Sequence, residues 1–244
     1  MSTETARTLI LASSSPRRQE LIRSLPFPVH VQSSDADETT EPGMTPEQIV
    51  ETLSLRKAAA VARILPDELQ SGIVIGSDTI VVLDGRVLGK PVDEQDAERM
   101  LSALQGREHH VYSGLACLDA AACRDLAVPV LENHEGYTGA RETACGAYRL
   151  LSGASGALAV TVGYTVSRVK FKPMSPGDIA GYIQTKEPMD KAGGYGVQGL
   201  GAMFVERLEG DFYSVMGLPV SLLHTMLAKL GLHPFSSGGG AALR

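Results

Sequence analysis

The sequence predicts a mixed α/β fold in which helices flank one β-sheet. Short apolar, β-branched runs typical of buried strands alternate along the chain with segments that carry helix-start signals. A proline follows Ser or Thr at positions 16, 46 and 176, and proline is favoured in the first turn of a helix. With 244 residues and 43% hydrophobic content, the chain can bury one substantial core.

Seven strands are expected from apolar and β-branched runs. In chain order they cover 8–12, 73–76, 80–83, 86–88, 110–118, 160–171 and 203–207. Asp84-Gly85 is a typical hairpin turn and returns the chain through the fourth strand. In the sixth strand the apolar residues change parity near Ser167, which predicts a β-bulge at that position.

Five helices are expected from caps and apolar periodicity. They begin at Pro16, Thr45, Asp93, Ser175 and Pro219, and the last four end near residues 65, 104, 184 and 230. Thr45-Pro46-Glu47-Gln48 has the spacing of a capping box.

Two segments lack a clear period. Residues 119–159, rich in Ala, Gly and small polar side chains, predict a partly disordered excursion inserted between two strands. Residues 185–201 are glycine-rich and predict a loop. We therefore expect a single domain over 1–233 and a disordered tail over 234–244.

Composition excludes several classes of protein. The chain has 22 basic and 28 acidic residues, a net charge of −6, so no general attraction to nucleic acid polymers or membranes is expected. No apolar run could span a membrane and no secretory signal is evident, so a cytoplasmic location is expected. The three cysteines lack metal-binding spacing, and P-loop, nucleophile-elbow and zinc-helix motifs are absent.

One candidate anion site is the turn Ser13-Ser14-Ser15-Pro16-Arg17-Arg18. Free backbone N–H groups at a helix start, hydroxyls and two guanidiniums all favour a phosphate. The alternative is a plain helix cap with two solvated arginines.

The second candidate is Asp78, placed at the end of an apolar strand segment. An acid in a β-rich run needs a compensating partner such as a metal ion or an activated water, although a turn aspartate bonded to nearby backbone is the alternative. Lys57, Lys90 and Glu38 are each typical of exposed side chains when taken alone. The run Glu187–Gly199 holds four glycines among polar residues, which suits either a loop that approaches a ligand or a flexible loop without one.

Taken together and in order, these segments resemble the Maf family of nucleotide pyrophosphatases. The matching runs are LILASSSPRRQEL (9–21), DADE (35–38), LRKA (55–58), IGSDTIVVLDGRVLGKP (75–91), GREHHVYSGL (106–115) and the glycine-rich stretch 186–219. The resemblance covers nearly all of 8–118 and 160–231. It implies an elongated mixed sheet in two lobes with a central cleft, similar to the inosine-triphosphate pyrophosphatases, and a cytosolic homodimer.

The resemblance also implies roles for individual residues. Asp78 matches the family's general base or metal-organising acid, and Glu38, Lys57 and Lys90 match further residues associated with activity. Ser13, Arg17 and Arg18 are expected to bind substrate, and Glu38 and Asp78 to hold Mg²⁺ or Mn²⁺. Arg17, Thr79 and Gln198 match the three specificity positions of the subgroup that acts on thymidine and uridine triphosphates.

The chain departs from the family pattern at Ser77, Ser113 and Gly194, all small changes, and in the length of 119–159.

The expected reaction is hydrolysis of dTTP or UTP to the monophosphate and pyrophosphate, as nucleotide-pool housekeeping. One alternative is the same chemistry on 7-methyl-GTP or another modified nucleotide, and another is a nucleotide-binding regulator of cell division with little catalysis.

Overall fold

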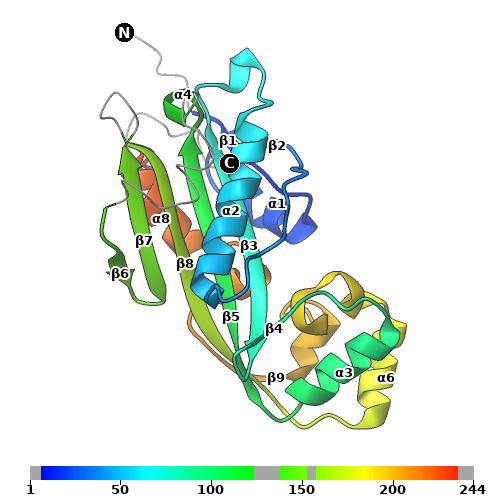
Figure 1. The fold of residues 1–244 in the computed structure, drawn as a ribbon. Coiled ribbons are helices and arrows are strands. Elements are labelled where there is room, and N and C mark those ends of the chain that lie inside the picture. The colour runs from blue at the N-terminus through cyan, green and yellow to red at the C-terminus, as the bar shows by residue number, and fades with distance from the viewer. Residues whose placement is uncertain (1–6, 124–137, 153–157, 236–244) are drawn as a thin grey trace.

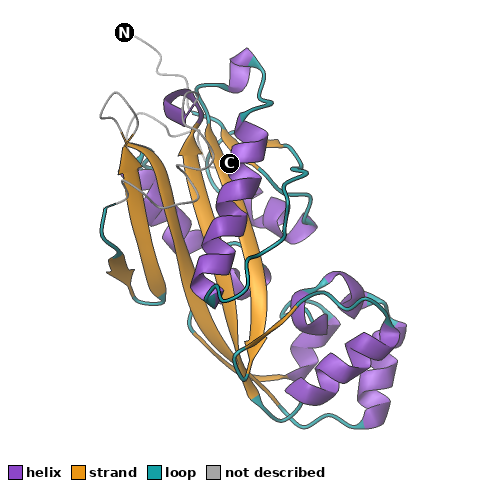
Figure 2. Ribbon diagram, viewed as in Figure 1, coloured by secondary structure: helices purple, strands orange, loops and turns teal. Residues whose placement is uncertain are grey.

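A long mixed β-sheet forms the body of the chain, with helices on both faces of one end and a smaller helical group at the other (Figures 1 and 2). The computed structural model describes residues 7–123, 138–152 and 158–235. The mixed α/β class predicted from the alternation of strand and helix signals is confirmed.

The elements have the following bounds. The strands are β1 (Leu9–Leu11), β2 (Val29–Val31), β3 (Ile73–Leu83), β4 (Arg86–Leu88), β5 (Glu108–Asp119), β6 (Arg141–Thr143), β7 (Gly146–Ser152), β8 (Leu158–Phe171) and β9 (Val205–Glu209). The α-helices are α1 (Pro16–Arg23), α2 (Pro46–Ala62), α3 (Glu94–Leu104), α4 (Ala120–Cys123), α6 (Pro176–Gln184), α7 (Phe212–Met216) and α8 (Val220–Lys229). Short 3₁₀ helices are η1 (Asp67–Leu69), η2 (Glu187–Asp190), η3 (Ala192–Gly194) and η4 (Leu200–Phe204).

The sheet has the order β2-β1-β3-β5-β8-β7-β6, and β4 and β9 pair with β3 and β8. β1 is parallel to both β2 and β3, whereas the remaining pairs are antiparallel. The helix starts follow the predicted caps: Thr45 and Gln48 form the capping box of α2, and Asp93 Oδ1 accepts from the Asp96 amide at 2.7 Å. The side chain of Ser15, the N-cap residue of α1, makes no capping hydrogen bond.

Two strand predictions are wrong. The runs 73–76 and 80–83 belong to one continuous strand, β3, so Asp78 lies in the middle of a strand and not at its end. The predicted bulge at Ser167 is absent, since β8 pairs with β5 in unbroken register from Val160 to Lys170. The parity change arises because β8 is covered on both faces near its start but mainly on one face beyond Tyr164.

Helix α2 lies very close to the central strands because two glycines remove side chains from its path. A Cβ atom at Gly76 would lie 2.0 Å from the Ser54 carbonyl oxygen, and one at Gly114 would lie 2.0 Å from that of Val50. Gly114 is also the cross-strand neighbour of Asp78. This close approach brings α2 within side-chain reach of Asp78.

The opposite face of the same half-sheet packs against α1, α7 and α8. Leu9, Leu11 and Ile75 on the strands meet Ile22 of α1 and Leu223 of α8 in a fully buried cluster. At the far end, β3, β5 and β8 continue into a second lobe, where they pack against α3, α6 and the 3₁₀ segments. The two lobes expected from the resemblance are therefore joined by shared strands.

The segment 119–159, which was expected to be an inserted excursion, runs from the end of β5 to the start of β8. Its described part adds β7, which pairs along β8, and the short edge strand β6. The predicted disorder of this excursion and of the tail falls largely on 124–137, 153–157 and 236–244, which lie outside the described residues.

Two further features concern the helices and the cysteines. Among the described helices, none combines the length and apolar character that crossing a membrane requires. All three cysteines are free thiols, and burial raises the pKa of Cys117 and Cys123 to about 12.

Candidate active site

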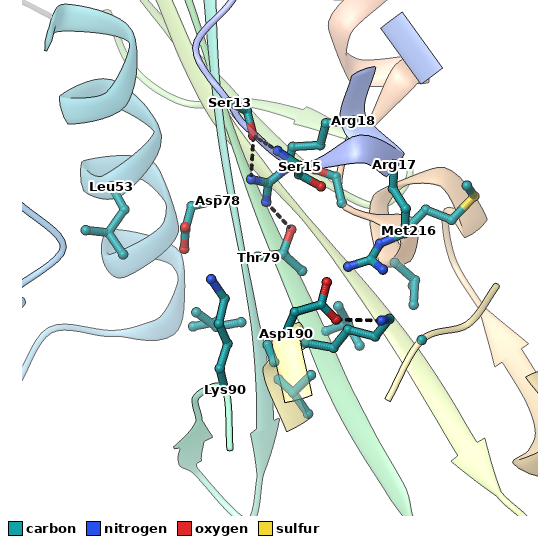
Figure 3. Close-up of a pocket in the computed structure, with 18 of the residues that line it drawn as sticks. Ser13, Ser15, Arg17, Arg18, Leu53, Asp78, Thr79, Lys90, Asp190 and Met216 are labelled. Carbon is teal, nitrogen blue, oxygen red and sulfur yellow. Dashed lines mark hydrogen bonds and ion pairs between the residues drawn. The ribbon is translucent and has the colours of Figure 1, made fainter. Parts of the chain in front are cut away.

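A cavity of about 630 Å³ lies where the two lobes meet. Its walls come from the β1–α1 turn, α2, the middle of β3, the segment after β4, the glycine-rich segment and α7 (Figure 3). Residues far apart in the chain therefore converge on one space, as expected of a ligand site.

The cavity adjoins an open stretch of the edge of β3. β1 pairs with residues 73–75 and β4 with 81–83, so in the described chain no strand covers the edge between them. The Ile75 carbonyl, which accepts from the Ala12 amide, points to this edge, and strand alternation directs the backbone groups of Ser77 and Thr79 the same way. Strand geometry also sends the Asp78 and Thr79 side chains to opposite faces of the sheet.

On the α2 side of β3, a lysine lies between two carboxylates. Lys57 Nζ is 2.6 Å from Asp78 Oδ1 and 2.8 Å from Glu38 Oε1. The Lys57 and Asp78 side chains are only 11% and 12% exposed, whereas that of Glu38 is 60% exposed. The hydrogen bond from Lys57 lowers the pKa of Glu38, so this carboxylate is ionised at neutral pH.

On the other side of β3, Arg18 bridges three segments. Its Nε donates to the Gly217 carbonyl at 2.7 Å, Nη1 to Ser13 Oγ at 3.4 Å and Nη2 to Thr79 Oγ1 at 3.2 Å. Burial lowers the pKa of Arg18, but a guanidinium remains charged at any physiological pH. Arg18 therefore fixes the β1–α1 turn against β3 and α7 while keeping its charge at the cavity.

The neighbours of the Thr79 hydroxyl determine whether it donates or accepts each hydrogen bond. Ser113 Oγ donates to the Ser214 carbonyl at 2.6 Å, so it accepts from Thr79 Oγ1, 2.9 Å away. The Thr79 hydroxyl donates its only hydrogen to Ser113 and accepts from Arg18. Its one remaining lone pair can therefore accept from a ligand, but Thr79 cannot donate to one.

The remaining charges make the cavity electropositive within an acidic chain. Arg17 and Lys90, both predicted, line it, and Lys90 extends toward Asp78 (Figure 3). The prediction missed Lys191, a 9% exposed lysine whose Nζ donates to Asp190 Oδ1 and to the Glu187 carbonyl, both at 2.6 Å. Together five cationic and three acidic side chains line the cavity, an excess of two positive charges.

The glycine-rich segment reaches the cavity through Tyr195, Gly196 and Val197. Gln198 comes next, but its side chain is exposed and is not among the cavity-lining groups. The structure thus gathers eight of the nine predicted residues around the cavity, and Gln198 is not one of them. Lys191 was missed because lysine is ordinarily exposed; its place within the glycine-rich run was the only signal.

Glu38 and Asp78 were also expected to hold a divalent metal. Among the described residues, no group of three or more Asp, Glu, His or Cys side chains forms a ready-made metal site. Lys57 Nζ contacts one oxygen of each carboxylate, Glu38 Oε1 and Asp78 Oδ1, so each acid has further lone pairs for an ion beside the ammonium. Mg²⁺ typically uses one or two carboxylates together with substrate phosphate oxygens, so the donor set fits such an ion once a polyphosphate is bound.

Comparison with known proteins gives matches over nearly the whole chain. The family model described as Maf-like protein matches residues 8–230. The chain is similar to a protein of Desulforamulus reducens named dTTP/UTP pyrophosphatase, with 42% identity over 93% of this chain and 98% of that one. Proteins of the same name from Pelotomaculum thermopropionicum (40% identity, 92% of this chain, 97% of the relative) and Bacillus velezensis (39%, 88% and 92%) are also similar.

Proposed function

The chain belongs to the Maf family, and from that premise we propose that it hydrolyses dTTP and UTP to the monophosphate and pyrophosphate. Such an enzyme removes nucleoside triphosphates from the nucleotide pool. The observation that carries the proposal is the Glu38–Lys57–Asp78 cluster within an electropositive cavity.

The chemical task is attack by water on the α-phosphorus, with cleavage of its bond to the oxygen that leaves with pyrophosphate. Repulsion between the polyphosphate and the nucleophile is the main obstacle, and fixed cations reduce it. Arg17, Arg18 and Lys90 are the proposed ligands of the phosphate oxygens. Ser13 supports Arg18, because its hydroxyl accepts from that guanidinium.

Asp78 is the proposed general base. Its Oδ1 accepts from Lys57, which leaves Oδ2 to accept a proton from the attacking water. Lys57 holds the carboxylate in a fixed orientation through this contact. Glu38 holds Lys57 from the solvent side.

A divalent cation, Mg²⁺ or Mn²⁺, is the proposed cofactor; Glu38 and Asp78 would hold it, Asp78 through a lone pair that neither Lys57 nor the attacking water uses. Such an ion would neutralise charge on the phosphates and polarise the phosphorus. We further propose that the enzyme acts in the cytoplasm as a homodimer, with no nucleic acid polymer or membrane as partner.

Selectivity for thymine and uracil is assigned to Arg17, Thr79 and Gln198. Both bases present an N–H between two carbonyls, and Thr79 can offer only a lone pair. Gln198, which is exposed, would have to turn inward when the nucleotide binds.

Isotope labelling tests the reaction directly. Hydrolysis of dTTP in H₂¹⁸O, followed by ³¹P NMR of the products, is expected to give ¹⁸O in the monophosphate and none in pyrophosphate. Label in pyrophosphate would mean attack at the β-phosphorus and would contradict the proposed mechanism.

A further inference from the structure

The backbone that follows the second lobe's 3₁₀ turns is folded tightly around one carboxylate. Tyr195, Gly196 and Val197 line the cavity, and the chain then turns back through Gly199, whose φ is +87°, into η4. Glu187, at the start of η2, is partly buried beneath this turn and is not a cavity-lining residue.

Glu187 accepts three hydrogen bonds from this region. Oε1 accepts from the Tyr182 hydroxyl at 2.9 Å and from the Gly201 amide at 3.0 Å. Oε2 accepts from the Leu200 amide at 3.0 Å. Every partner is a donor, so only a group that accepts at both oxygens satisfies all of them.

Tyr182 carries the contact onward to the cavity wall. Its hydroxyl donates to Glu187 and accepts from the amide of Gly196, 3.2 Å away. The ring stays in place through packing in the second lobe, with its centroid 5.2 Å from that of Phe204. A chain of two hydrogen bonds thus links Glu187 to a residue that touches the ligand space.

Steric contacts leave this segment little room to adjust. A Cβ atom at Gly199 would lie 2.9 Å from Glu187 Oε2. One at Gly201 would lie 2.4 Å from the Gly196 carbonyl oxygen and 2.6 Å from the Tyr182 hydroxyl. The backbone is therefore packed directly onto the carboxylate and the phenol.

We propose that Glu187 is a positioning residue that sets nucleotide affinity by holding the segment from Gly196 to Gly201 against the cavity. This inference rests on the proposed function, because the affinity in question is that for the nucleotide substrate. Glu187 acts through the backbone of its neighbours and touches no reacting atom. Gln198 lies within the segment that it holds.

The carboxylate stays ionised at neutral pH. Burial opposes its charge, but the hydrogen bonds from Gly201, Leu200 and Tyr182 outweigh that effect and lower the pKa of Glu187. Glutamine has nearly the same shape but presents an NH₂ group at one position. In either orientation of that amide, its NH₂ group faces at least one of the donors that surround Glu187, namely the Leu200 amide, the Gly201 amide or the Tyr182 hydroxyl.

The test compares Glu187→Gln with Glu206→Gln, the same substitution at a surface carboxylate of β9 that pairs with Lys170 of β8. We expect Glu187→Gln to raise KM for dTTP about tenfold while kcat stays within about threefold, since the Asp78–Lys57 cluster is untouched. Glu206→Gln should change neither constant. Equal KM values for the two variants, with active wild-type enzyme, would overturn the inference and leave the proposed function standing.

Tyr182→Phe provides a second variant, because it keeps the packed ring and removes the hydroxyl that links Glu187 to Gly196. It should raise KM by a smaller factor, and an unchanged KM would count against the link.

Amide hydrogen exchange supplies a readout that needs no turnover. Faster exchange at Gly196, Leu200 and Gly201 in Glu187→Gln is expected, and unchanged exchange would overturn the inference even if the wild-type enzyme proved inactive on dTTP.

Discussion

Replacing Asp78 by asparagine separates the chemical role of this carboxylate from its structural one. The change keeps the shape of the side chain and an oxygen that can accept from Lys57, but removes the charge and the proton acceptor. Lys57 keeps Glu38 as a partner at 2.8 Å, although that side chain is 60% exposed and so is screened by water. The perturbation is therefore confined to one nearly buried group.

The structure sets the expected magnitudes. Breaking a buried ion pair costs about 3–5 kcal/mol when the remaining charge is left alone. Because Lys57 retains both an amide oxygen and Glu38, we expect a smaller loss of unfolding free energy, about 1–3 kcal/mol. Turnover should fall at least about a hundredfold, equivalent to roughly 2.7 kcal/mol in the activation barrier, as is usual for loss of a general base.

The assay is pyrophosphate release at saturating dTTP, run well below the unfolding temperature of the variant. Asp84→Asn is the matched control. Asp84 is exposed on the β3–β4 hairpin, and neither Asp84 nor its ion-pair partner Arg107 lines the cavity. The control should turn over at the wild-type rate. A folded Asp78→Asn enzyme with kcat within about threefold of wild type would refute the assignment of Asp78 as base.

Three further outcomes are expected. Gln198→Ala should narrow the preference for dTTP and UTP over CTP, measured as ratios of kcat/KM; identical ratios would remove Gln198 from base recognition. Burial lowers the pKa of His109 from 6.5 to about 4, so only the unfolded state gains this proton as the pH falls between those values. The free energy of unfolding should then fall by about 3 kcal/mol from pH 6.5 to 4. Denaturant titrations at the two pH values should show a smaller fall in His109→Gln than in the wild type. Gly114→Ala should destabilise by about 2–4 kcal/mol through contact with Val50, and an unchanged melting temperature would contradict the packing described.

Local signals in the sequence carried much of the fold. The capping box at Thr45, the Asp93 cap and the Asp84-Gly85 turn are encoded by neighbouring residues, so they could be located without tertiary information. β2 was missed because Val29–Val31 is a three-residue strand that is only half-buried. β3 was divided in two because polar residues at 77–79 interrupt its apolar pattern, and their partners lie on α2, α1 and β5.

The candidate site likewise depends partly on local sequence signals and partly on the three-dimensional fold. Asp78, Lys57 and Glu38 could be nominated one by one, and the resemblance to a known family joined them, but only the three-dimensional fold shows that Lys57 bridges the two acids. Lys191 and Glu187 carry no individual signal. Their roles depend on backbone groups brought near them by the turns between η2 and η4.

The measurement that tests the central claim most directly is pyrophosphate release across a panel of triphosphates in the presence of Mg²⁺ or Mn²⁺. The panel holds dTTP, UTP, CTP, 7-methyl-GTP and the ordinary purine triphosphates. We expect release led by dTTP and UTP and abolished by chelation of the metal. Release led by another base would contradict the assigned specificity, and a folded enzyme that releases no pyrophosphate from any of them would contradict the proposed function itself.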